Sequence, residues 1–91
     1  MKEGYLLVIV DWLDITSHDG AWLDIEEAKK YVPSRMRTVG FLLKEEPDYI
    51  VVVSTVSDDL DTVGSANAIP RGCLISISPL QQTGECLDKK I

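Results

Sequence analysis

The sequence of 91 residues predicts a mostly β protein made of five short strands and one brief helix. Runs rich in β-branched and aromatic residues recur along the chain, turn-forming residues separate them, and only one stretch has helical spacing. The length suits one domain, residues 1–91, with a modest core. We expect the compact part to span about residues 4–80 and residues 81–91 to form a flexible tail.

The five expected strands are apolar runs bounded by acidic, proline-containing or glycine-containing turns. Alternation in the last run predicts Leu74 on the opposite face from Cys73 and Ile77. The predicted strand ranges are 5–12, fading near Thr16, then 36–44, 49–56, 63–69 and 73–78.

A helix is expected over residues 25–32, between the first two strands. Asp24 is placed as its N-cap, and Glu27 three residues later resembles the second half of a capping box. An acidic first turn and a basic last turn suit the helix dipole, and Pro33 ends the helix.

The order of these elements, with a proline-containing tight turn before the last strand, is that of a small SH3-like or Sm-like barrel. Closure of a five-stranded sheet would hide the strand edges that an open sheet exposes. The predicted fold is therefore a five-stranded small SH3-like or Sm-like barrel with one short helix between the first two strands.

The first and third strands carry apolar residues on both faces, whereas a half-solvated antiparallel strand alternates. Leu7 and Ile9 oppose Val8 and Val10, and the third strand repeats this pattern. Either the helix and tails cover the second face or a second subunit does. We favour the subunit interface, because so much exposed aliphatic surface exceeds what monomers tolerate. The sequence therefore predicts a homo-oligomer.

Charge and cysteine content limit the partners and the compartment. Nine Lys and Arg against fifteen Asp and Glu give a net charge of -6, which disfavours general nucleic-acid binding. Two cysteines, Cys73 and Cys86, are too few for a disulfide framework. We expect both to be free thiols in a reducing cytoplasm. The N-terminus lacks the pattern of a secretory signal, and residues 5–10 are too few to cross a membrane.

No arrangement of residues in the sequence indicates a particular reaction, and we expect a protein that is not an enzyme. Ser17, His18 and Asp19 are adjacent in one turn, whereas a catalytic triad needs side chains that converge from separate elements. His18 with Asp14 and Asp19 lacks the fixed ligands of a tight metal site. We therefore expect no catalytic residues, no metal and no cofactor.

The segments Trp12-x-Asp14, Ser17-His18-Asp19-Gly20 with Trp22, Glu26-Glu27-Ala28, Thr38-Val39-Gly40, Asp48-Tyr49-Ile50, Ser54-Thr55 and the run from Ile69 to Ile77 form a pattern over most of the chain. This pattern resembles a set of small proteins encoded mainly by bacteriophages and prophages. Phage proteins of this size include inhibitors and oligomeric sponges that sequester the cyclic-nucleotide signals of bacterial immunity. The resemblance implies a phage protein that evades immunity in the host cytoplasm.

The side chains that such a ligand requires are present. Flat bases stack on aromatic rings, and phosphates accept charge-assisted hydrogen bonds. Each candidate also has an ordinary structural reading, such as core packing for a tryptophan or strand formation for a threonine. The candidate ligand-binding residues are Trp12, Trp22, Arg37, Thr38, Ser54, Thr55 and Arg71, with Phe41 and Tyr49 as further stacking surfaces and Asp14 and Asp19 as readers of a guanine edge.

The hypothesis that these observations favour is a non-enzymatic oligomer that sequesters a small nucleotide-like ligand, a cyclic oligonucleotide, near subunit junctions. One alternative is a protein-interaction module that binds and inhibits a host protein, with its negative charge steering it to a basic partner. Another alternative is an Sm-like RNA binder, which the net negative charge of the chain disfavours.

Overall fold

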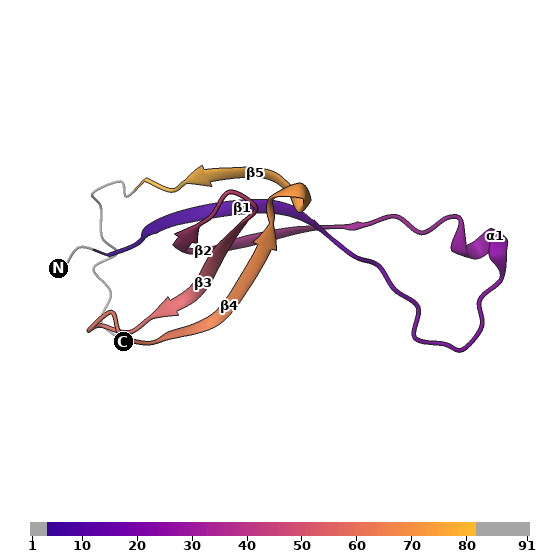
Figure 1. The fold of residues 1–91 in the computed structure, drawn as a ribbon, viewed down its shortest axis with the longest axis horizontal. Coiled ribbons are helices and arrows are strands. Elements are labelled where there is room, and N and C mark those ends of the chain that lie inside the picture. The colour runs from indigo at the N-terminus through magenta and orange to yellow at the C-terminus, as the bar shows by residue number, and fades with distance from the viewer. Residues whose placement is uncertain (1–3, 82–91) are drawn as a thin grey trace, which may run out of the picture.

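The computed structural model describes residues 4–81, which form one five-stranded antiparallel sheet with very little helix (Figure 1). All five strands predicted from the sequence are present. The expected flexible tail lies almost entirely outside the described residues. The elements are β1 (Leu6–Asp14), α1 (Ile25–Ala28), β2 (Ser34–Glu45), β3 (Tyr49–Val56), β4 (Val63–Pro70), the 3-10 turn η1 (Arg71–Cys73) and β5 (Leu74–Pro79).

The strand order is β4-β3-β2-β1-β5, with every neighbouring pair antiparallel. The first four strands follow one another as hairpins, and β5 returns to pair with β1. Within the described residues β4 and β5 do not pair with each other, so the sheet is open and the predicted closure into a barrel is not observed. The structure thus confirms the mostly β class and the predicted order of the five strands and one short helix along the chain.

The core lies on one face of this sheet, where alternate residues of each strand point inward. Val8 and Val10 of β1 meet Ile50 and Val52 of β3, and Ile69 of β4 completes the cluster. These five side chains are at most 1% exposed. Half-buried residues pack around them, namely Trp12, Leu42, Cys73, Leu74 and Ile77.

Gly40 allows β2 to pair with both β1 and β3. β2 pairs with β1 from Ser34 to Leu42 and with β3 only from Phe41 onward. Gly40 is buried where β3 passes over it, and a Cβ placed there would collide with the backbone carbonyl oxygen of Val53. Glycine is therefore required by close approach of two backbones.

A β-bulge in β5 overturns the predicted face of Leu74. Ile77 pairs with Val10 and Leu74 pairs with Trp12, so both point to the core face. The register shifts by one residue between these pairs, which leaves Ile75 unpaired and 43% exposed. Strict alternation was the wrong assumption, because a bulge inserts one residue and reverses the faces beyond it.

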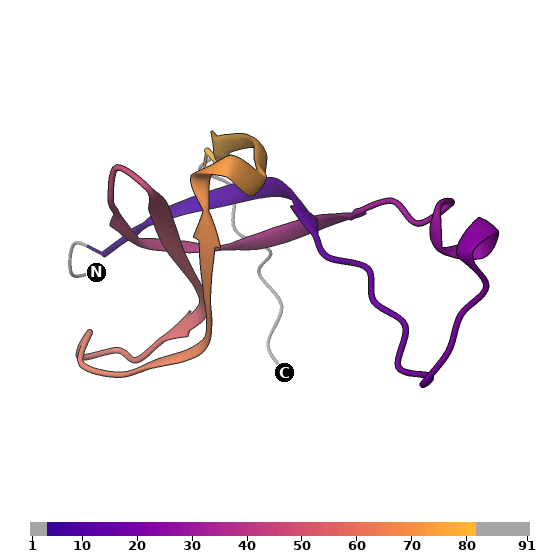
Figure 2. The same ribbon diagram turned by 45° about the vertical axis from the view of Figure 1, so that its right-hand side comes forward.

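Residues 15–33, between β1 and β2, extend away from the sheet, and we call them the arm (Figures 1 and 2). Its helix α1 has four residues where eight were predicted, and the side chain of Asp24 makes no capping hydrogen bond. The predicted length and capping box are therefore wrong. α1 buries no residue, and an isolated helix this short gains too few hydrogen bonds to propagate. Because it points away, the helix does not cover the second face of the sheet.

Candidate functional site

The structure disperses the seven residues that the sequence selected as a ligand site. Trp12, Arg37 and Thr38 lie on the β1–β2 pair, with Trp12 and Thr38 on one face and Arg37 on the other. The other four are spread over three places. Ser54 and Thr55 are near the end of β3, Arg71 opens η1, and Trp22 lies in the arm.

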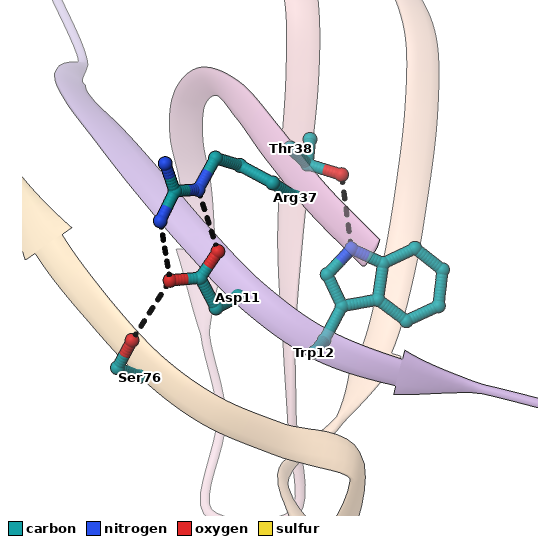
Figure 3. Close-up of polar contacts among 5 residues, drawn as sticks. All are labelled: Asp11, Trp12, Arg37, Thr38 and Ser76. Atoms are coloured by element: carbon teal, nitrogen blue, oxygen red, sulfur yellow. Dashed lines mark hydrogen bonds and ion pairs between the residues drawn. The ribbon is translucent and has the colours of Figure 1, made fainter. Parts of the chain in front are cut away.

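Trp12 is held at the edge of the core. Its indole Nε1–H donates a hydrogen bond to Thr38 Oγ1 at 3.0 Å, and its ring packs against the buried cluster (Figure 3). A half-buried indole normally needs such a partner for its N–H. In this arrangement both side chains have a structural role.

Arg37 lies on the opposite face from Trp12 and is paired with Asp11 across the β1–β2 ladder (Figure 3). Its Nε and Nη2 donate to the two carboxylate oxygens at 2.7 and 3.1 Å, and Ser76 of β5 donates to the same carboxylate at 3.4 Å. The hydrogen bond from Arg37 lowers the pKa of Asp11, and the same bond raises the pKa of Arg37. The cluster ties β2, β1 and β5 together.

Arg71 fastens η1 to the β2–β3 hairpin. Its Nε donates to the carbonyl oxygen of Glu46 at 2.9 Å, and its Nη2 lies 3.7 Å from the carboxylate of Glu45. Its backbone N–H donates to the carbonyl oxygen of Asp48 at 2.9 Å. Both arginines chosen as phosphate binders therefore have acidic neighbours, and they lie on different elements, Arg37 on β2 and Arg71 in η1.

The hydroxyls of Ser54 and Thr55 lie 3.4 Å apart on β3. Ser54 also donates to the carbonyl oxygen of Gly64 on β4 at 3.3 Å. These hydroxyls are exposed, but they bond within the β3–β4 pair and lie apart from the tryptophans and arginines.

Trp22 is the most exposed large hydrophobic residue described, at 93%. Ile15, Ile25 and Val32 of the same arm are 83%, 69% and 70% exposed. The base of the arm is closed by Thr16, whose hydroxyl donates to the carbonyl oxygen of Val32 at 2.7 Å and lies 2.8 Å from the hydroxyl of Ser34. The contacts of Thr16 thus close the base of the arm, and apolar side chains along the arm are exposed to solvent.

A cavity of about 230 Å³ lies between the start of β1, the middle of β2 and the β3–β4 turn. In Figure 1 the β3–β4 turn is at the end of the molecule opposite the arm. It is partly open to solvent. Its walls are mainly aromatic and aliphatic, with one carboxylate. The lining residues are Gly4, Tyr5, Phe41, Val56, Ser57, Asp58 and Leu60.

The β3–β4 turn beside this cavity is held by its own polar groups. Ser57 Oγ donates to the carboxylate of Asp59 at 2.6 Å and accepts from the backbone N–H groups of Asp61 and Thr62. The hydrogen bond from Ser57 lowers the pKa of Asp59. Leu60 has φ of 61°, in the left-handed region that favours glycine or asparagine. The turn therefore holds an apolar side chain at the cavity wall in an unfavourable backbone conformation.

Comparison of the chain with family models, curated proteins and solved structures found no match. Within residues 4–81, no three acidic, histidine or cysteine side chains come together in a metal-ligating cluster. In the same range no helix is long and apolar enough to span a membrane. Site assignment therefore depends on geometry alone.

Sequence reasoning missed the cavity and the Asp11–Arg37 pair. Tyr5 and Leu60 are 55 residues apart in the sequence, and only the sheet brings them to one cavity. The pairing of Asp11 with Arg37 depends on strand register, which a single sequence does not fix between two runs joined by a long connection. The signal that could have found the arm was the density of apolar residues within an otherwise polar connection.

Proposed function

We propose that this chain is a non-enzymatic protein-interaction module that binds another protein through the apolar end of its arm. The observation that carries the proposal is Trp22, a 93% exposed indole on the projecting arm, whose residues 15–33 are all exposed. An isolated surface hydrophobic needs no explanation, but four apolar side chains at least 69% exposed on one projecting segment, Ile15, Trp22, Ile25 and Val32, favour a binding surface.

The energetics support a protein partner. Complete burial of a Val, Leu, Ile or Phe side chain contributes roughly 1.5–3 kcal/mol. Association itself costs roughly 4–15 kcal/mol. Burial of three exposed side chains of the arm would offset part of that cost, namely those of Ile15, Trp22 and Ile25. Tryptophan is also enriched among the few residues that dominate interface energies.

Sequestration of a cyclic oligonucleotide, which the sequence favoured, has less geometric support. The two arginines meant for phosphate bind acidic residues of the same chain, and the two tryptophans lie on different parts of the molecule. An Sm-like RNA-binding role is opposed by the net charge of -6. The arm has no arginine, and each of its two lysines pairs with a glutamate of α1.

The scaffold that presents the arm is in this proposal a small SH3-like barrel with open edges. The order in which β5 pairs with β1 after a 3-10 turn supports this assignment. The phage-like resemblance makes the cytoplasm of a bacterium the proposed setting, and inhibition of a host protein is the corresponding role.

The test places a photo-crosslinking amino acid at position 22 and, as a control, at exposed Ser78 of β5, in bacterial cells. The proposal expects covalent adducts with protein from position 22 and none from position 78. In parallel, the purified chain is titrated calorimetrically with cyclic di- and trinucleotides, for which no heat is expected. Heat with a nucleotide and no protein adduct would replace this proposal with the sponge hypothesis.

A further inference from the structure

We infer that the cavity beside the β3–β4 turn binds a methylated ammonium group, held by the rings of Tyr5 and Phe41 and by the carboxylate of Asp58. All three residues line the cavity. The site is separate from the arm, so the inference goes beyond the proposed function and does not depend on it.

Two aromatic rings reach the cavity from neighbouring strands. Phe41 of β2 pairs with Leu7 of β1, and Tyr5 lies two residues before Leu7, which puts Tyr5 and Phe41 on the same face of the sheet. Aromatic side chains at such diagonal positions are within reach of each other. The face of an aromatic ring carries partial negative charge and attracts a cation within about 6 Å of its centre.

The charge at the cavity excludes an anion and disfavours a neutral ligand. Asp58 is the only charged residue among the seven that line the cavity, and it makes no ion pair within residues 4–81. Asp59 and Asp61 add negative charge in the same turn. A neutral ligand would take water from the carboxylate of Asp58 without giving it a partner, which costs free energy. A cation supplies that partner.

The scarcity of free acceptors favours a methylated ammonium over a primary one. A primary ammonium brings three N–H donors, and each needs an acceptor. The hydroxyl of Ser57 is already used, because it donates to Asp59 at 2.6 Å and accepts from two backbone N–H groups of the turn. A fully methylated ammonium has no N–H group. Its methyl groups suit the aliphatic walls that Val56 and Leu60 supply.

The turn that carries Asp58 is ordered by its own backbone. The N–H of Leu60 donates to the carbonyl oxygen of Ser57 at 2.9 Å, and the N–H of Ser57 donates to the carbonyl oxygen of Thr62 at 2.8 Å. Asp58 therefore lies inside a closed turn. A site that is ordered in advance loses less conformational freedom on binding.

The test is a titration of the full chain with choline at constant ionic strength, followed by NMR on the amide signals of residues 57–60. The matched control ligand is dimethylbutanol, the neutral analogue of choline in which carbon replaces the charged nitrogen. We expect choline to shift these signals saturably. It should bind about 2- to 30-fold more tightly than the analogue, which is the range that cation–π contacts supply.

Variants assign the binding to the lining residues. Tyr5→Leu and Asp58→Asn should each weaken choline binding by about 2-fold or more. Both side chains are exposed, so we expect both variants to keep the fold. Tyr5→Phe keeps a ring, and Asp48→Asn removes a carboxylate that does not line the cavity. These two control variants should bind choline like the unaltered chain.

Three results would overturn the inference. They are the absence of saturable shifts at residues 57–60, equal affinity for choline and its neutral analogue, and unchanged binding by Tyr5→Leu and Asp58→Asn. A peptide that contains trimethylated lysine identifies the source of the group. Tighter binding of the peptide than of choline assigns the site to a modified protein side chain, and weaker binding assigns it to a free small cation. Trp22→Ser should bind choline normally, which separates this test from that of the arm.

Discussion

At the scale of single residues, the pairing of Asp11 with Arg37 makes the stability of the sheet depend on pH. The hydrogen bond from Arg37 lowers the pKa of Asp11 from its ordinary value of 3.8. A carboxyl whose pKa is lower in the folded than in the unfolded state stabilises the fold fully above the unfolded value. That contribution is lost as the pH falls through the folded pKa.

We therefore predict that Asp11→Asn lowers the free energy of unfolding at pH 7 and that its deficit relative to the unaltered chain shrinks as the pH is lowered below about 3.8. Urea unfolding at a series of pH values measures both. Asp48→Asn is the control, since that side chain makes no ion pair among the described residues. A deficit that stays constant to pH 2 would show that the ion pair is not its cause.

The hydrogen bond from Trp12 to Thr38 gives a second prediction for single residues. In a double-mutant cycle with Trp12→Phe and Thr38→Val, we expect a coupling free energy of about 0.5–1.5 kcal/mol, the usual net value of a hydrogen bond between neutral groups. Chemical denaturation of the four proteins supplies the cycle. Strictly additive effects would mean that the two side chains do not interact in solution.

At the scale of elements, β2 depends on the missing side chain of Gly40. Gly40→Ala should lower the free energy of unfolding by about 1–3 kcal/mol, because its methyl group displaces the β3 backbone. Gly64→Ala is the matched control, since a Cβ there meets Thr55 at an ordinary distance of 3.6 Å. Thermal unfolding compares the two. Equal stability of both variants would contradict the close approach of β2 and β3.

The arm is the second element with a direct test. Residues 15–33 can be replaced by Asn-Gly, which favours a tight hairpin turn between Asp14 and Ser34. Because the arm buries no residue, we expect the shortened chain to keep its sheet, with a circular dichroism spectrum and unfolding midpoint close to those of the unaltered chain. A chain that fails to fold would show that the arm packs against the sheet.

These elements also show what the sequence could and could not supply. Local composition was sufficient to predict the strands and the turns between them. β3, for example, spans the residues that were predicted for it. Local composition could not predict how the strands pair with one another. The bulge that exposes Ile75 and the register that pairs Asp11 with Arg37 arise from contacts between strands. The helix was predicted too long because local propensity at residues 25–32 takes no account of the lack of a surface to pack against.

At the scale of the whole molecule, exposed apolar surface was predicted on the second face of the sheet. The structure exposes apolar side chains most strongly in the arm instead. The second face of the sheet buries Val53 and leaves Leu7 and Ile9 half-buried. The most exposed apolar side chains instead belong to the arm, and Trp22 is the most exposed of them. The sequence did select Trp22 as a candidate binding residue, but its exposure on a projecting arm could not be predicted, since a tryptophan is as readily a core residue.

The central claim is that Trp22 becomes buried when the arm binds protein, and its fluorescence tests this most directly. In Trp12→Phe, Trp22 is the sole tryptophan. We predict that its emission shifts to shorter wavelength and that acrylamide quenches it less when the protein that crosslinks to position 22 is added and that protein's own emission is subtracted, whereas added cyclic nucleotides have no effect. Emission that stays typical of a solvent-exposed indole with that protein, and that responds to a nucleotide instead, would contradict the account.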